Sequence, residues 1–144
     1  MILRVFLDAS VLFSAAYSSS GFARDLLVSG YRPDVTLSVS PDVVDEVTLN
    51  LSSKRPKALA TLRSFIADGS LLVVSPDPSV VRRCADVVDE KDAHVVAGAL
   101  AAGASIVATF DLRHLLSQAD LIRAAFGVEV LTPRDVLERI ATDE

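Results

Sequence analysis

The sequence predicts one α/β domain over residues 1–144, with a central parallel β-sheet of about five strands flanked by helices on both faces. Three observations support this prediction. Strand-like apolar segments alternate with helical segments along the chain, and their connections are short. The first apolar segment is continuous, as in a strand that is covered on both faces. No repeat, linker or low-complexity stretch divides the chain.

The first half of the chain contains three predicted strands and the helices that accompany them. The strands are expected at residues 2–7, 35–39 and 71–74, and the helices at residues 11–17, 22–29, 41–51, 56–68 and 79–88. The third helix has the clearest start, because Ser40 is a typical N-cap and Pro41 suits the first helical position. Gly30 and Gly69 are expected to end the second and fourth helices.

The second half has its clearest pattern in residues 89–111, "DEKDAHVVAGALAAGASIVATFD". This segment predicts a polar loop, an alanine-rich helix, a cap at Gly103, a strand over residues 105–109 and a polar turn. A helix over residues 115–125, a strand over 128–131 and a final helix from Pro133 complete the expected order.

The composition narrows the class of protein. Hydrophobic residues make up 51% of the chain, yet no apolar run approaches the roughly 20 residues of a membrane helix. The start lacks the layout of a signal peptide, so a cytoplasmic protein is expected. The single cysteine, Cys84, is expected to pack within a helix, since it has no partner for a disulfide. The apolar excess is consistent with a surface that a partner chain covers.

The net charge of −5 argues against broad electrostatic attraction to nucleic acid. It leaves open a nucleic-acid enzyme whose acids gather at a metal site. Any phosphate contacts would then come from local basic groups. The "KRPK" cluster at residues 54–57 is usually only the polar start of a helix, but it is also a candidate clamp for a nucleic-acid backbone. Arg24, Arg32 and Arg113 are further candidates.

Carboxylates recur at positions where an open parallel sheet binds its ligands. Asp8 directly follows the first strand, and Asp111 lies just past the fourth. If these strands are neighbours at the point where the strand order reverses, both side chains face one crevice. Asp92 begins the alanine-rich helix, and Glu46 lies within the helix after the second strand. The four acids would then surround the same crevice.

Each acid taken alone has a simpler explanation. Asp8 and Asp111 are typical turn or cap residues, and Asp92 suits the N-terminal end of a helix dipole. Glu46 alone reads as a solvated helix residue, and the adjacent Asp45 is equally eligible. Only the joint arrangement points to chemistry.

Four carboxylates around one crevice require compensation. Two such charges ~5 Å apart repel by roughly 3 kcal/mol at an effective dielectric constant of ~20. No lysine or arginine is obviously placed beside Asp8 or Asp111 to neutralise them. Ligand sets made only of oxygen suit Mg²⁺ or Mn²⁺, which activate water and assist in-line displacement at phosphorus. The pattern therefore favours a metal-dependent nuclease.

Three segments, in this order and spacing, resemble the PIN-domain family, in particular the toxins of type II toxin–antitoxin pairs. The segments are "VFLDASVLFSAA", "SVSPDVVDEVTLNL" and "DEKDAHVVAGALAAGASIVATFD". The resemblance implies an endoribonuclease that uses Mg²⁺ or Mn²⁺ and leaves 5′-phosphate and 3′-hydroxyl ends. It also implies a homodimer and a cognate antitoxin that covers the active-site groove.

The resemblance assigns roles to individual positions. Asp8, Glu46, Asp92 and Asp111 would form the catalytic, metal-binding cluster. Ser10 would hydrogen-bond near Asp8 or the substrate phosphate.

Neighbouring residues are less specific. Thr109 would either hold the strand end or contact a metal-bound water. Asp89 is either a fifth acid or a loop residue. His94 is expected to be a solvated helix residue, and His114 is a weaker candidate for contact with substrate.

Two alternatives belong to other classes. A catalytically inactive PIN-like module would bind RNA or protein without cutting. A phosphoaspartyl enzyme would also place an aspartate after a parallel strand, but the dehalogenase-type phosphatases need a second aspartate where this chain has Ser10. Neither a GxGxxG motif nor a P-loop is present, which disfavours nucleotide-binding α/β proteins.

Overall fold

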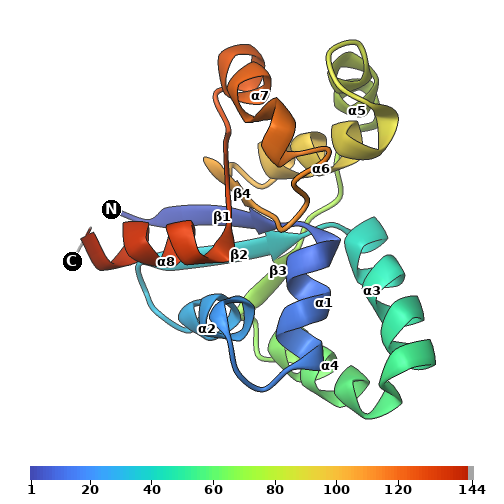
Figure 1. The fold of residues 1–144 in the computed structure, drawn as a ribbon, viewed down its shortest axis with the longest axis vertical. Coiled ribbons are helices and arrows are strands. Elements are labelled where there is room, and N and C mark those ends of the chain that lie inside the picture. Colours follow the sequence, from blue (N-terminus) through green and yellow to red (C-terminus); the bar gives the residue numbers. More distant parts are fainter. Residues whose placement is uncertain (143–144) are drawn as a thin grey trace.

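The structure, a computed structural model, describes residues 1–142 and contains a five-stranded parallel sheet in the order β3-β2-β1-β4-β5 (Figure 1). The strands are β1 (Leu3–Leu7), β2 (Val35–Val39), β3 (Leu71–Val73), β4 (Ile106–Ala108) and β5 (Glu129–Leu131). The predicted α/β class and strand number are confirmed. Helices cover both faces of the sheet, as expected for parallel strands joined by crossovers.

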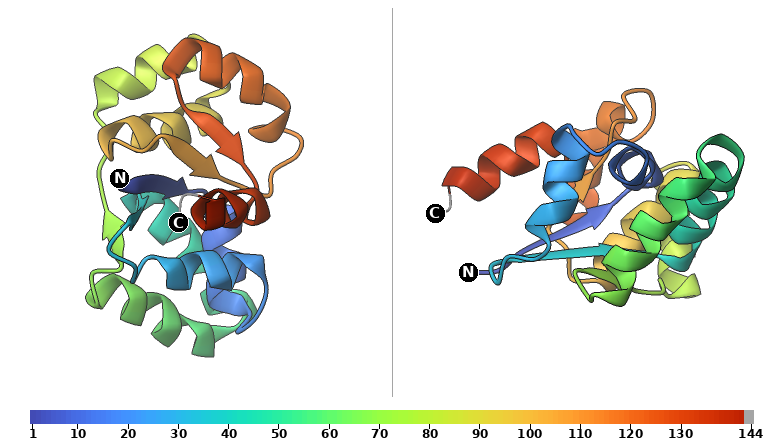
Figure 2. Two further views of the ribbon diagram at one scale, coloured as in Figure 1. Left: turned by 90° about the vertical axis from the view of Figure 1, so that its left-hand side faces the viewer. Right: turned by 90° about the horizontal axis from the view of Figure 1, so that it is seen from below.

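The helices fall into two groups around this sheet. They are α1 (Ala9–Tyr17), α2 (Phe22–Ser29), α3 (Pro41–Lys54), α4 (Leu59–Ala67), α5 (Pro78–Ala85), α6 (Glu90–Ala101), α7 (Ala119–Phe126) and α8 (Pro133–Thr142), with 3₁₀ turns at Pro56–Ala58 and Leu116–Gln118. α2 and α8 pack together on one face, and α6 lies on the other with α5 against it (Figure 2). None of the helices within residues 1–142 has the length and apolar character to cross a membrane.

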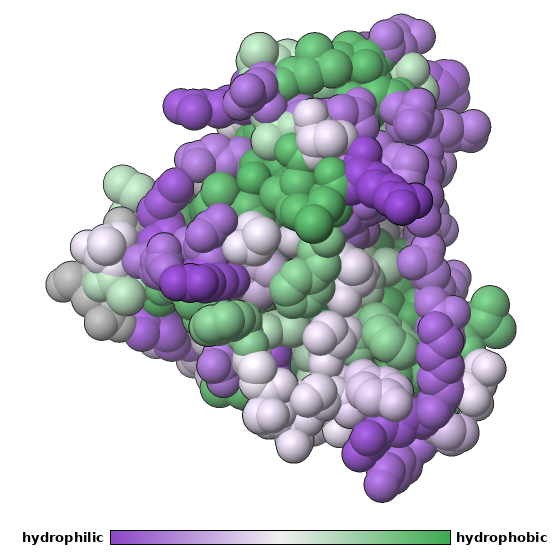
Figure 3. All heavy atoms as spheres, in the orientation of Figure 1, coloured by the Kyte–Doolittle hydropathy of each residue, from purple (hydrophilic) through white to green (hydrophobic). Residues whose placement is uncertain are grey.

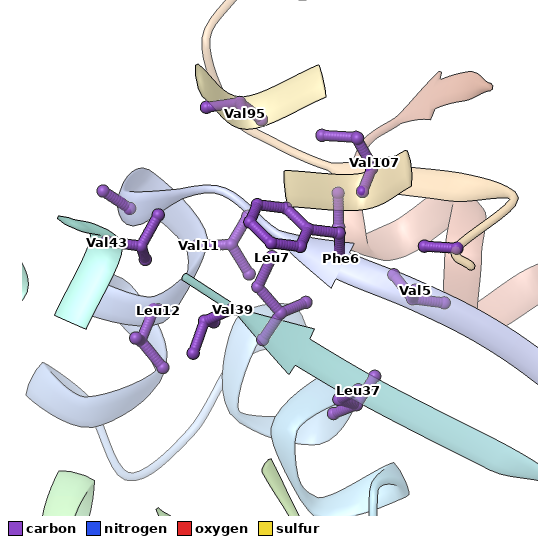
Figure 4. Close-up of a cluster of buried hydrophobic side chains, with 14 of the residues drawn as sticks. Val5, Phe6, Leu7, Val11, Leu12, Leu37, Val39, Val43, Val95 and Val107 are labelled. Carbon is purple, nitrogen blue, oxygen red and sulfur yellow. The ribbon is translucent and has the colours of Figure 1, made fainter. Parts of the chain in front are cut away.

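The core is centred on β1, the middle strand of the sheet. Its residues Val5, Phe6 and Leu7 are fully buried, and Figure 4 shows them among side chains from β2, β4, α1 and α3. α6 approaches β1 closely because it carries small residues. A Cβ added at Gly98 would lie 2.6 Å from Cζ of the Phe6 ring, a distance that side chains do not tolerate. The glycine therefore sets how near α6 lies to the sheet.

Element boundaries differ from the prediction mainly where capping is involved. α1 begins at Ala9 rather than residue 11, because Asp8 has the extended backbone of an N-cap position. Ser40 accepts a hydrogen bond from the N–H of Val43 at 3.2 Å, as predicted, but α3 continues to Lys54. The predicted helix over 79–88 starts one residue earlier, at Pro78, where Asp77 caps it through the N–H of Ser79. It also ends earlier, at Ala85.

The other differences are local. The helix expected over 56–68 and the one expected over 115–125 both start as 3₁₀ turns. Gly30 does end α2, with an ordinary φ of −63°. The reason for glycine there is space: a Cβ would lie 2.6 Å from the carbonyl oxygen of Ser70.

Candidate active site

A hollow of about 320 Å³ lies beyond the carboxyl ends of β1 and β4, and all four predicted acids line it. They are Asp8, Glu46, Asp92 and Asp111. β1 and β4 are adjacent in the sheet. The strands β2 and β3 follow on the β1 side, and β5 follows on the β4 side. The expected reversal of strand order is therefore present, at the position where such sheets bind ligands.

Asp8 is held by hydroxyl groups from two distant segments. Its Oδ2 accepts hydrogen bonds from the hydroxyl of Ser10 at 3.0 Å and from the hydroxyl of Thr109 at 2.7 Å. Its backbone N–H donates to the carbonyl of Ala108 at 3.0 Å, which continues the pairing of β1 with β4. The Asp8 side chain makes no capping bond to α1. The simpler interpretation of Asp8 as a helix cap thus fails to explain its carboxylate.

Asp111 belongs to the same network through its backbone. Its N–H donates to the Thr109 hydroxyl at 2.9 Å, and the preceding N–H of Phe110 donates to Ser10 Oγ at 3.1 Å. Thr109 is fully buried. Its hydroxyl therefore links the carboxylate of Asp8 to the backbone of Asp111. This geometry corresponds to the predicted role in which Thr109 holds the end of the strand.

The Asp111 side chain also caps the turn that follows it. Its Oδ1 accepts from the N–H groups of Arg113 and His114 at 3.2 and 3.1 Å. The simple interpretation of this residue as a cap is thus correct for one carboxylate oxygen. Because the residue also lines the hollow, capping and orientation toward the site occur together.

Asp92 is only 2% exposed, although it lies in the first turn of α6. Gln118 donates to its Oδ2 at 3.0 Å. Burial raises the pKa of Asp92, the negative charges of Asp111 and Asp89 raise it further, and the Gln118 bond and His114 oppose the shift. A solvated acid at a helix terminus would have no such environment. A buried acid with a perturbed pKa in a hollow is typical of a functional site.

Glu46 and Asp45 differ in where they lie. Glu46 lines the main hollow and also an adjoining one of about 200 Å³, whereas Asp45 lines neither among the described residues. Both residues are exposed. The position of α3 thus favours Glu46 over its neighbour.

A second group of possible ligands overlaps the first at Asp92. One ligand atom from each of Asp89, Asp92 and His114 lies within 4.8 Å of the others, and Nδ1 of His114 lies 4.0 Å from Oδ2 of Asp89. From the sequence, Asp89 could be either a fifth acid or a loop residue, and His114 was only a weak candidate for contact with substrate. The turn after β4 brings His114 to the start of α6, which sequence spacing alone does not reveal.

Lys91 lies beside the acids and lines both hollows. The expectation that no cation stands near Asp8 was therefore wrong at this position. Asn50, Phe13 and Phe110 also line the main hollow and were not identified from the sequence. A helical spacing of four residues between Glu46 and Asn50 was the available signal.

His94 lies at the edge of the adjoining hollow. Its Nδ1 is 3.5 Å from Oδ2 of Asp42 and is buried without a hydrogen bond of good geometry, although the side chain as a whole is 43% exposed. The prediction that His94 is a solvated helix residue is therefore only partly correct.

The donor set fits a hard divalent cation. Four carboxylates line the hollow, whereas Lys91 is the one lysine or arginine among the residues that line it. Carboxylate oxygens are the preferred protein ligands of Mg²⁺ and Mn²⁺.

Comparison with known proteins agrees with this geometry. The family model described as PIN domain matches residues 4–113. VapC20 of Mycobacterium tuberculosis, described as a toxin that cleaves the sarcin–ricin loop, has a similar fold. Its TM-score is 0.60 at 15% identity, covering 78% of this chain and 94% of that one.

A second similar structure is VapBC2 of Rickettsia felis, bound to a DNA fragment from its promoter. Its TM-score is 0.63 at 12% identity, covering 89% of this chain and 97% of that one. No curated protein matches. Identities this low show a shared fold, while the family match spans most of the sequence. The resemblance found in the three sequence segments is thus confirmed, and the chain belongs to the PIN domain family.

Proposed function

We propose that this protein is a metal-dependent endoribonuclease. The observation that carries the proposal is the hollow at the carboxyl ends of β1 and β4, which four acids from four separate segments line. Structural caps or solvated helix acids would have no reason to converge on one hollow, because their charges repel one another.

The residues of the hollow have different proposed roles. Asp8, Glu46, Asp92 and Asp111 would hold one or two Mg²⁺ or Mn²⁺ ions. A bound ion of this kind would activate a water molecule and stabilise the charge that develops at phosphorus. Ser10 and Thr109 orient the Asp8 carboxylate through their hydroxyls. Lys91, at the rim of the same hollow, is placed to attract a substrate phosphate.

We further propose that the protein is the toxin of a type II toxin–antitoxin pair in the cytoplasm, acting as a homodimer with a cognate antitoxin. The support is family membership together with the similar folds of VapC20 and VapBC2. A neighbouring reading frame for a small DNA-binding protein would add support.

Incubation of the purified protein with RNA, with and without Mg²⁺, Mn²⁺ and EDTA, tests the nuclease proposal. The substrates should include structured tRNA and rRNA, and the ends of the products should be mapped. We expect cleavage that requires the metal and leaves 5′-phosphates. Cleavage that persists in EDTA would contradict the metal mechanism. RNA binding without cleavage of any substrate would instead favour an inactive binding module.

A further inference from the structure

One side of α3 changes character along its length. Glu46, Asn50 and Lys54 recur every four residues and therefore lie on the same side of the helix. Glu46 and Asn50 line the acidic hollow. Lys54 follows about 12 Å further along the helix axis, at roughly 1.5 Å per residue. A cation thus stands two turns beyond the acids on the same side.

α1 presents aromatic rings toward the basic end of α3. Phe13 and Tyr17 are four residues apart, and their ring centroids are 5.5 Å from each other. Nζ of Lys54 lies 5.4 Å from the Phe13 centroid, and Cζ of Arg55 lies 5.2 Å from the Tyr17 centroid. These four residues are called the aromatic–cation strip. Phe13 also lines the acidic hollow, so the strip begins where the hollow ends.

The two cations of the strip contact its rings, but their charges are not neutralised by acids in the described part of the chain. None of the ion pairs between residues 1–142 involves Lys54 or Arg55. Lys54 is exposed, and Tyr17 is 39% exposed, so the strip is not part of the core. Figure 3 shows hydrophilic residues in a column over α3 at the right of the molecule. The protein as a whole is acidic, so this surface, with two cations over aromatic rings and no paired acid, differs from its overall charge.

This combination matches the chemistry of an unpaired nucleic-acid strand. Cations pair with phosphates, while aromatic rings and the guanidinium plane offer surfaces on which unpaired bases stack. A duplex keeps its bases stacked inside and offers only its backbone to such a surface. A strip that combines both groups therefore favours single-stranded RNA.

We propose that the aromatic–cation strip binds an unpaired segment of the RNA substrate next to the phosphate that is cut. The strand leaves the acidic hollow along α1 and α3, its phosphates meet Lys54 and Arg55, and its bases stack on Phe13 and Tyr17. This inference rests on the proposed nuclease function and deepens it. It assigns the four residues of the strip to the binding of the strand beside the hollow.

Fluorescence anisotropy with a labelled, unstructured 12-nucleotide RNA tests the charges. The full chain carries Asp8→Asn to prevent cleavage, with Lys54→Ala plus Arg55→Ala added. We expect at least tenfold weaker binding and a log–log salt slope that is smaller by about 1.4, or ~0.7 for each lost phosphate contact. The matched control, Arg82→Ala plus Arg83→Ala on the distant helix α5, removes the same charge and should leave the affinity within twofold (Figure 1).

Substitution of Tyr17 separates stacking from charge. Tyr17→Leu should weaken binding roughly five- to hundredfold at both low and high salt, because stacking is not screened. Tyr17→Phe should restore the affinity. A role confined to helix packing would leave RNA affinity unchanged in both variants. That result would overturn the stacking part of the proposal.

Cleavage by the wild-type chain is measured in parallel, so that the two proposals fail separately. If the wild type cleaves RNA but the Lys54/Arg55 double variant binds RNA with unchanged affinity, the proposed role of the strip is wrong. The nuclease proposal would still hold. If the double variant keeps its RNA affinity but no longer binds a co-expressed protein partner, the proposal is also wrong, because the strip would then be the binding surface for that partner. Strip-dependent RNA binding without wild-type cleavage would support the strip and contradict the nuclease.

Discussion

The hollow has two halves that are built differently. In the strand half, Asp8 and Asp111 follow adjacent strands, and the hydroxyls of Ser10 and Thr109 join them in one hydrogen-bond network. In the helix half, Glu46 is exposed on α3, and Asp92 is buried at the start of α6. The sheet therefore supplies fixed positions, and the helices supply one adjustable and one desolvated carboxylate.

This difference has an energetic meaning. A ligand whose rotamer is locked loses little entropy when it binds a cation, whereas an exposed glutamate must lose side-chain freedom first. A buried carboxylate is costly until a cation arrives. In the proposed metal site the strand half would thus be prepared in advance, and the helix half would gain most from the ion. The predictions below test this contrast.

The largest effect is expected from Asp8→Asn, in the strand half. We expect RNA cleavage to fall by roughly 100- to 1,000-fold or more, as when one group that stabilises a polarised transition state is removed. Single-turnover rates at saturating Mn²⁺ measure this. Asp25→Asn on α2 is the control for a lost acid, and it should cut at the wild-type rate. Wild-type activity in the Asp8 variant would remove the basis of the mechanism.

Thr109→Val should break the network while leaving every acid in place. The valine is similar in shape but has no hydroxyl to donate to Asp8 or to accept from the Asp111 N–H. We expect a loss of about 10- to 100-fold in metal affinity or rate, as for other groups that orient ligands. Thr109→Ser retains the hydroxyl and should recover most activity. Equal defects in both variants would point to packing instead.

Glu46→Gln should have a smaller effect, which added metal can reverse. Because Mg²⁺ usually keeps several waters, water can take over part of the role of an exposed ligand. We expect roughly tenfold weaker metal activation, recovered at higher Mn²⁺, as at the lower end for ligand-supporting groups. Metal titrations of the cleavage rate measure it. Asp45→Asn, one residue away, is the control, and a stronger defect there would reverse the assignment.

Asp92→Asn should change stability in opposite directions with and without metal. Burial raises the pKa of Asp92, so the wild type loses stability as the pH rises through that pKa and the buried acid ionises. The neutral amide avoids this loss and can still accept from Gln118. In EDTA we expect the variant to melt a few degrees higher than the wild type at pH 8, with a smaller difference at pH 5.

Thermal melts with Mn²⁺ complete this test. The wild type should gain more from the ion than the Asp92 variant, because ligand binding to the folded state stabilises it. A variant that melts lower than the wild type in EDTA at pH 8 would show that the carboxylate serves the fold.

The sequence predicted the strand half better than the helix half, for physical reasons. Asp8 and Asp111 follow apolar strands, and parallel strands place such positions at one edge. The choice between Glu46 and Asp45 depends on how α3 is rotated, which the pattern of buried valines only partly constrains. The proximity of His114 to Asp89, and of Lys91 to the acids, depends on loop paths and helix placement that no local pattern encodes.

The α/β fold class could be predicted from the alternation of strand-like and helical segments. The errors of that prediction were at the ends of helices. Propensity alone cannot set these ends, because single capping bonds decide them, as at Asp77. The pairing of Lys54 and Arg55 with aromatic rings was also invisible in the "KRPK" cluster, since the rings come from α1.

The close contact of Gly98 with Phe6 has a consequence for the chemistry of the hollow. α6 carries Asp92 at its start, so the spacing between that helix and β1 fixes how far this carboxylate stands from Asp8. Mg²⁺ tolerates little departure from bonds of roughly 2.0–2.1 Å, whereas Ca²⁺ accepts longer and more varied ones. In the proposed metal site, a methyl group added at Gly98, six residues from Asp92, would therefore alter which ion is preferred.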